Sequence, residues 1–204
     1  FAGATPAELA DAQAAAEAAD LVVLALGEPA SMSGEASSRT EIDLPGTQNA
    51  LAQAVIAVGR PTAAVLFGGR PLAIEQLSQA ADAILMAWYP GTMGGTAIAR
   101  VLFGLAEPTA RMPMTTPRAV GQIPLHHDRL PSGRPAIKWP DLYSANYVDR
   151  PTTPLYPFGH GLGYTRFAFD APRLDRDRLE GDGEAGVSVA VRNVGPRTGT
   201  AMVQ

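Results

Sequence analysis

Cysteine is missing from this chain of 204 residues. Its absence excludes disulfide bonds and thiolate metal sites, but it fits the cytosol and the periplasm equally well. No apolar run approaches the roughly 18 residues of a membrane-spanning helix, and no signal peptide is recognisable. Lys and Arg form no cluster, and the net charge is −4. We therefore expect neither nucleic acid nor a membrane surface as a partner.

Apolar residues make up 46% of the chain and charged residues 18%, which suits a globular core of ordinary size. Apolar runs typical of buried strands alternate with segments of helical period. This alternation predicts an α/β fold, a three-layer sandwich with a mostly parallel sheet and helices on both faces. The predicted strands are 21–26, 62–67 and 83–88, and the predicted helices are 5–19, 47–58, 72–79 and 92–103.

Prolines from 113 to 157 rule out long regular elements in the next part of the chain, while tyrosines and phenylalanines supply large apolar surface. A disordered tail would be poor in aromatic residues. We expect an ordered wrap around the α/β core.

The last residues, 187–204, alternate like a half-buried strand, turn at Gly195-Pro196 and begin a further strand. A two-stranded hairpin is only marginally stable in water. These residues are expected to be the first strands of a truncated β-sandwich, and the chain to be a fragment. Because it begins at Phe1 and not at Met, an upstream targeting segment stays an open alternative.

The loop after the first predicted strand concentrates charge. It contains Glu28, Glu35, Arg39 and Asp43 between the strand and Pro45-Gly46. Loops at the carboxyl ends of buried strands commonly carry the sites of α/β proteins. A solvated loop with an ordinary Glu–Arg pair is the alternative interpretation. The segment Gly68-Gly69-Arg70-Pro71 lacks the spacing of a phosphate-binding loop and is expected to be a tight turn.

Five segments together resemble glycoside hydrolase family 3, and more narrowly its periplasmic bacterial β-glucosidases. The likeness covers residues 15–170, and the tail beyond 172 resembles the start of a fibronectin type III-like domain. We therefore place an α/β domain at 1–170 and a linker with the truncated second domain at 171–204. The five segments are Gly27 to Pro45, Leu66 to Leu72, Ala87 to Ala99, Arg111 to Pro124, and Tyr156 to Thr165.

The resemblance implies a retaining, exo-acting β-glucosidase that hydrolyses terminal β-D-glucosyl residues of glucosides or oligosaccharides. In the family, an N-terminal (β/α)8 barrel supplies the Asp nucleophile and the α/β domain supplies the acid/base Glu. No residue here matches the nucleophile motif, so the barrel of the same enzyme is the expected partner and the fragment alone is expected to be inactive. The mechanism requires no cofactor. A periplasmic or secreted location is implied.

Two glutamates align with the family's acidic position. We favour Glu35 as the acid/base because a residue farther along the loop reaches farther into a pocket built by another domain. Glu28, at the strand end, is the alternative, with loop-fixing hydrogen bonds as its other role. Arg39 and Trp88 are candidate substrate-binding residues, although Arg39 also suits a surface ion pair and Trp88 a core position. The three histidines lack metal-ligand spacing, and no metal site is expected.

Two other classes of function stay open. A non-catalytic carbohydrate-binding or scaffold module would keep the α/β domain without a barrel. A doubly wound domain that binds a small ligand would not depend on Glu35.

Overall fold

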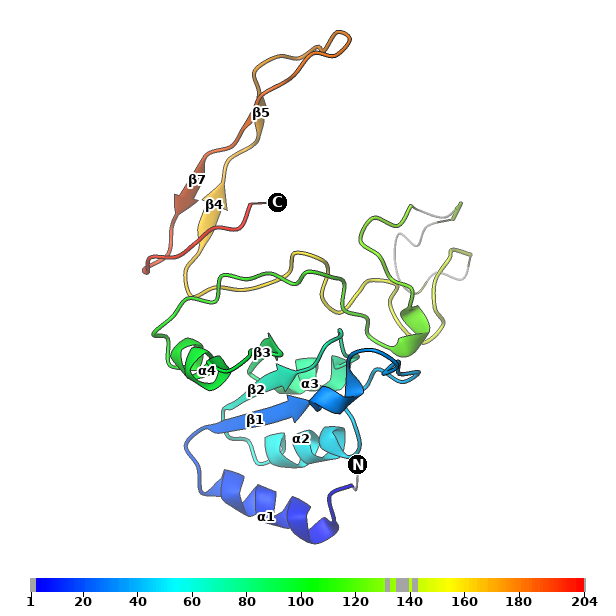
Figure 1. Ribbon diagram of the computed structural model, residues 1–204, viewed down its shortest axis with the longest axis vertical. Coiled ribbons are helices and arrows are strands. Elements are labelled where there is room, and N and C mark those ends of the chain that lie inside the picture. The colour runs from blue at the N-terminus through cyan, green and yellow to red at the C-terminus, as the bar shows by residue number, and fades with distance from the viewer. Residues whose placement is uncertain (1–2, 131–132, 135–139, 141–142, 204) are drawn as a thin grey trace. The chain divides into compact units, whose positions relative to one another are not determined.

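The computed structural model describes residues 3–130, 133–134, 140 and 143–203 (Figure 1). It divides into two compact units, Phe1–Gly95 with Met112–Phe158, and Thr96–Arg111 with Gly159–Gln204. Pro131 and Pro135 of the expected wrap lie outside the described residues. No helix of the described part is both long and apolar enough to cross a membrane.

The first unit is built on a parallel sheet in the order β1-β2-β3. The α/β class and the parallel sheet are confirmed, and strands β2 and β3 coincide with their predicted ranges. The strands are β1 (Val22–Gly27), β2 (Thr62–Phe67) and β3 (Ala83–Trp88), and the helices are α1 (Pro6–Glu17), α2 (Gln48–Ile56), α3 (Glu75–Ala80) and α4 (Gly94–Leu102). The division between the two units falls within α4.

Helix α1 begins at a capping box. The Thr5 hydroxyl accepts a hydrogen bond from the Glu8 amide, and the Glu8 carboxylate accepts one from the Thr5 amide at 2.7 Å. These bonds satisfy amide groups that have no partner inside the helix. The capping box thus confirms the predicted start of the first helix. In Figure 1, α2 lies between α1 and strand β1.

The core lies between one face of the sheet and helices α1 to α3. Leu24 and Leu26 of β1 and Leu66 of β2 pack there with Leu77 of α3. On the opposite face Val65 is 3% exposed, whereas Val23 of β1 is 48% exposed. The continuous apolar run at 21–26 is typical of a strand buried on both faces, and this interpretation is wrong for β1. An apolar run does not reveal that an edge strand has one uncovered face.

The proline-rich segment is held to the core by long-range polar contacts. The Thr116 amide donates to the Tyr156 carbonyl at 2.8 Å, and the Tyr156 and Ser78 hydroxyls share a hydrogen bond of 2.6 Å. Glu75 at the start of α3 pairs with Arg118 at 2.7 Å and also with Arg150. An ordered wrap is confirmed for the described residues of this segment.

In the second unit, short strands form two antiparallel pairs, β4 with β7 and β5 with β6. They are β4 (Phe167–Phe169), β5 (Arg173–Leu174), β6 (Val187–Ser188) and β7 (Val191–Asn193). The chain bends at Gly195-Pro196 as predicted, but the hairpin expected there does not form. Strand β7 pairs antiparallel with β4 instead, and residues 198–203 form no strand. Pairing between distant segments leaves no local signal in the sequence.

Candidate functional site

The carboxyl ends of the three parallel strands bring together the segments that follow them. Glu28 follows β1, Arg70 lies shortly after β2, and Tyr89 follows β3. Glu28 and Arg70 form an ion pair, and the Tyr89 hydroxyl donates to the Pro29 carbonyl at 3.1 Å. Ligands of open α/β sheets bind at this edge. The charged loop is thus in contact with the segments that follow β2 and β3.

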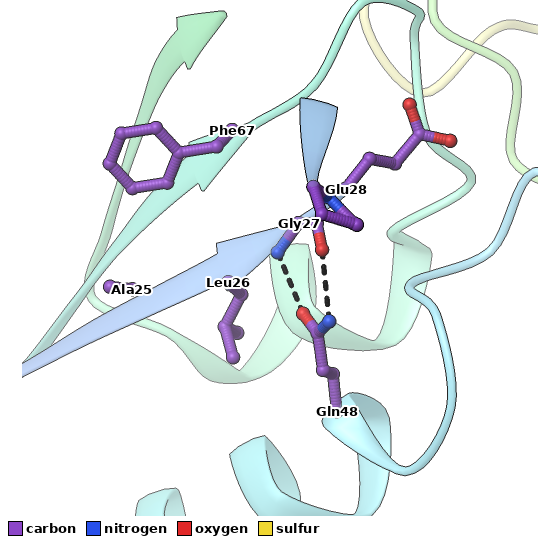
Figure 2. Close-up of a pocket in the computed structure, with 7 residues that line it drawn as sticks. Ala25, Leu26, Gly27, Glu28, Gln48 and Phe67 are labelled. Carbon is purple, nitrogen blue, oxygen red and sulfur yellow. Dashed lines mark hydrogen bonds between the residues drawn. The ribbon is translucent and has the colours of Figure 1, made fainter. Parts of the chain in front are cut away.

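The chain leaves β1 through a clamped glycine. The Gly27 amide donates to the Gln48 side-chain oxygen at 2.6 Å, and the Gln48 side-chain nitrogen donates to the Gly27 carbonyl at 2.9 Å (Figure 2). Gly27 has a φ of +131°, and a Cβ there would lie 1.9 Å from the Phe67 carbonyl oxygen. Only glycine fits this position. Gln48 opens α2, so both ends of the loop are joined.

Glu28 is the buried centre of the loop's ion pairs. Its side chain is fully buried, and in Figure 2 its carboxylate points away from Gln48. Arg39 Nη1 lies 2.5 Å from Glu28 Oε1, and Arg70 Nε lies 3.1 Å from the same oxygen and 3.2 Å from Oε2. Arg39 also donates to the Asp43 carbonyl at 3.0 Å. The guanidinium of Arg39, a candidate for substrate binding, therefore engages the loop itself.

Glu35 is exposed near the tip of the same loop. The chain passes through a short 3₁₀ helix (η1, Ala30–Met32), and the Ser37 amide then donates to the Gly34 carbonyl at 3.2 Å, which closes a β-turn around Glu35 and Ala36. Ala36 has a φ of +58°. A left-handed alanine costs roughly 1–2 kcal/mol, so the contacts around the turn must compensate for this strain.

Trp88 ends β3 with a φ of +53°, which is rare for a bulky side chain. The β2–β3 register shifts between Leu66 and Phe67, so that Phe67 is paired with Trp88. The ring is only partly buried, and the Trp88 carbonyl accepts a bond from the Gly68 amide at 3.4 Å. Trp88 therefore lies at the carboxyl end of β3, beside the segment that carries Gly68 and Arg70.

A hollow of about 240 Å³ lies at the end of β1, and Figure 2 shows residues that line it. It is smaller than the roughly 300–1,000 Å³ usual for ligand pockets. Its walls are mostly strand residues and the Gln48 side chain, and the buried Glu28 is its one ionisable group. The lining residues are Ala25, Leu26, Gly27, Glu28, Pro29, Gln48 and Phe67.

The histidines have separate surroundings. His127 stacks on Phe158 with a ring-centroid distance of 4.2 Å. Burial, together with the positive charge of Arg111, lowers the pKa of His160 below its usual range. In the described part of the chain, no three His, Asp or Glu side chains converge as they would around a metal ion.

Arg70 is the part of the site that sequence reasoning missed, since the glycine-rich segment around it was expected only to turn. A signal was available. The carboxyl ends of adjacent parallel strands meet at one edge, so an Arg after β2 lies within reach of an acidic residue after β1.

These observations define a class of protein: an α/β domain with an anchored acidic loop at the carboxyl ends of its parallel strands. Residues 3–164 match the family model described as the glycosyl hydrolase family 3 C-terminal domain. The chain belongs to this family.

Individual relatives agree with the family match. The chain is 45% identical over 195 residues to a periplasmic β-glucosidase of Salmonella typhimurium and 37% identical over 198 residues to a β-xylosidase of Formosa agariphila. Each alignment covers 95% of this chain and 26% of the relative. The chain thus spans about a quarter of the length of these relatives.

Solved structures show the same fold. A β-glucosidase from Listeria innocua in complex with glucose matches with a TM-score of 0.90 at 35% identity, covering 96% of this chain and 27% of that one. A β-glucosidase from Erythrobacter marinus matches with a TM-score of 0.86 at 42% identity, covering 96% of this chain and 26% of that one.

Proposed function

We propose that this chain is the acid/base domain of a retaining, exo-acting β-glucosidase that removes terminal β-D-glucosyl residues. It works with an N-terminal (β/α)8 barrel of the same enzyme, which carries the Asp nucleophile. Family membership and the relatives named β-glucosidase support this proposal. The observation that carries it is an exposed carboxylate, Glu35, at the tip of a loop whose base is fixed by buried ion pairs.

Glu35 is our choice for the acid/base because of access. An acid/base must touch the glycosidic oxygen and later a water molecule. Glu28 is 3% exposed, and both of its oxygens lie within reach of arginine nitrogens, so substrate has no route to its carboxylate. Glu35 lies in solvent, free to enter a pocket supplied by a second domain. Glu28 and Arg39 are then positioning residues, and Trp88 borders the sugar.

The proposed reaction needs two carboxyl groups about 5 Å apart. The Asp of the barrel attacks the anomeric carbon while Glu35 gives its proton to the departing oxygen, which leaves a glucosyl–enzyme ester and an ionised Glu35. Glu35 then takes a proton from water, and the resulting hydroxide displaces the Asp. The α/β domain alone, with half of this pair, is expected to be inactive.

The location that we propose is the periplasm or the extracellular space, by analogy with the relative named periplasmic β-glucosidase. Because other relatives are named β-xylosidases, the sugar specificity is assigned to the barrel and not to this loop. We propose glucose as the terminal residue of the substrate by analogy with the relative named β-glucosidase, which is 45% identical to this chain.

The test is cellobiose hydrolysis by the complete enzyme carrying Glu35→Gln. A loss of about 10²-fold or more in kcat/KM is expected, because the amide cannot donate a proton to a poor leaving group. Glu41→Gln removes another exposed carboxylate from the same loop and is expected to keep the activity. Undiminished hydrolysis by Glu35→Gln would contradict the assignment of Glu35 as the acid/base.

A further inference from the structure

Arg70 makes more contacts with the charged loop than its ion pair requires. Its Nε faces Glu28, while its Nη2 donates to the Ser37 carbonyl at 2.9 Å and also to the Met32 carbonyl. One guanidinium therefore joins the start of the loop to two later points of its backbone. The side chain is 22% exposed, so these bonds are partly shielded from water.

The two carbonyls flank the turn that presents Glu35. Met32 ends η1 before the turn, and Ser37 closes it through its bond to Gly34. Fixing both carbonyls to one planar group limits how the residues between them can move. The contacts also hold the turn in the conformation that requires a left-handed Ala36.

Gly69 brings the loop close to the segment that carries Arg70. A Cβ on Gly69 would lie 2.0 Å from Ser33 Oγ and 3.2 Å from Tyr89 Cε2. Ser33 therefore packs directly on the backbone beside Arg70. A side chain at this position would require Ser33 of the loop to shift.

We propose that Arg70 is the positioning residue of the acid/base, and that Gly68-Gly69-Arg70 is the seat that sets where the Glu35 carboxylate stands. This inference rests on the proposed function. Arg70 acts through the loop backbone and does not touch the substrate. It keeps the Glu35 carboxylate at one position during both proton transfers. This matters because a displacement of about 1 Å can reduce the rate about 10²-fold.

Lysine cannot replace this arginine. The guanidinium presents five donors in a fixed plane, and here that plane serves one carboxylate and two carbonyls. An ammonium keeps the charge and the pairing with Glu28, but as a compact point charge it cannot span acceptors on different parts of the loop. Arg70→Lys therefore separates the positioning role from the charge.

The experiment compares Arg70→Lys with Arg118→Lys in the complete enzyme. Arg118 is a matched control, since its side chain is 21% exposed and it likewise joins a carboxylate, Glu75, to a backbone carbonyl, that of Thr153. For Arg70→Lys we expect kcat on cellobiose to fall about 10- to 10²-fold with little change in KM. On 2,4-dinitrophenyl β-glucoside, whose leaving group needs no proton, glycosylation is expected to change by less than about threefold.

Gly69→Ala provides a second variant that leaves every charge in place. It is expected to give the same leaving-group selectivity, whereas Gly121→Ala, where a Cβ meets nothing within 4 Å, is expected to leave both rates unchanged. Urea unfolding of each variant establishes that the measured enzyme is folded.

Equal losses on both substrates, or no loss, in Arg70→Lys and Gly69→Ala would overturn the positioning role. If Glu35→Gln impairs cellobiose hydrolysis while these variants do not, the inference alone fails. If Glu35→Gln itself has no effect, the proposed function fails first. Loss in Arg118→Lys equal to that in Arg70→Lys would likewise overturn a specific role for Arg70.

Discussion

In the complete enzyme, Glu35→Gly is expected to become dependent on added azide. Cellobiose hydrolysis should fall by at least about 10²-fold, because no group protonates the departing sugar. With 2,4-dinitrophenyl β-glucoside the first step should proceed, and the glucosyl ester should then accumulate because no base activates water. Azide needs no base and fits the space vacated by the carboxylate, so it should restore turnover.

The product identifies the residue's role. Attack by azide on the glucosyl ester inverts the anomeric carbon a second time, so the expected product is β-glucosyl azide. Glu41→Gly, which removes a neighbouring exposed carboxylate of the loop, should form no azide product. Failure of azide to accelerate Glu35→Gly, or an α-configured product, would contradict the assignment of Glu35 as acid/base of a retaining enzyme.

Regular elements of the first unit could be predicted from the sequence because their signals are local. The apolar runs at 62–67 and 83–88 coincide with β2 and β3, and Thr5 with Glu8 marks the start of α1. The boundaries of α3 were less accurate. A start at 72 was expected, but α3 begins at Glu75, and the buried Leu72 and Ile74 lie in an irregular segment before it. Hydrophobic periodicity alone does not separate these two states.

The candidate site was predictable only in part, because its contacts join residues that are distant in sequence. A carboxylate cluster after β1 is visible as a pattern, but the pattern does not say which carboxylate is buried. Burial of Glu28 depends on Arg70, which follows a different strand. The pairing of β4 with β7 was not predicted either, because these strands are also distant in sequence. Local patterns specify elements, while tertiary packing assigns each charged residue its partner.

Glu28→Gln is expected to reduce the free energy of unfolding by about 3–5 kcal/mol. The physical reason is charge. The Glu28 side chain is fully buried, and its carboxylate forms ion pairs with both Arg39 and Arg70. A neutral amide of the same size leaves two partly buried guanidiniums facing each other without an anion between them.

Glu75→Gln is the matched control for this measurement. Glu75 also bridges two arginines, Arg118 and Arg150, but its side chain is 16% exposed and that of Arg150 is 39% exposed. Water therefore screens this cluster, and the expected loss is only about 1 kcal/mol. Urea unfolding, monitored by circular dichroism, gives the stability of both variants. A shift of the transition midpoint at an unchanged m-value, the dependence of the unfolding free energy on urea concentration, reports the loss. If Glu28→Gln cost no more than Glu75→Gln, the Glu28 ion pairs would not be the anchor of the loop, and the fixed position assigned to Glu35 would lose its physical basis.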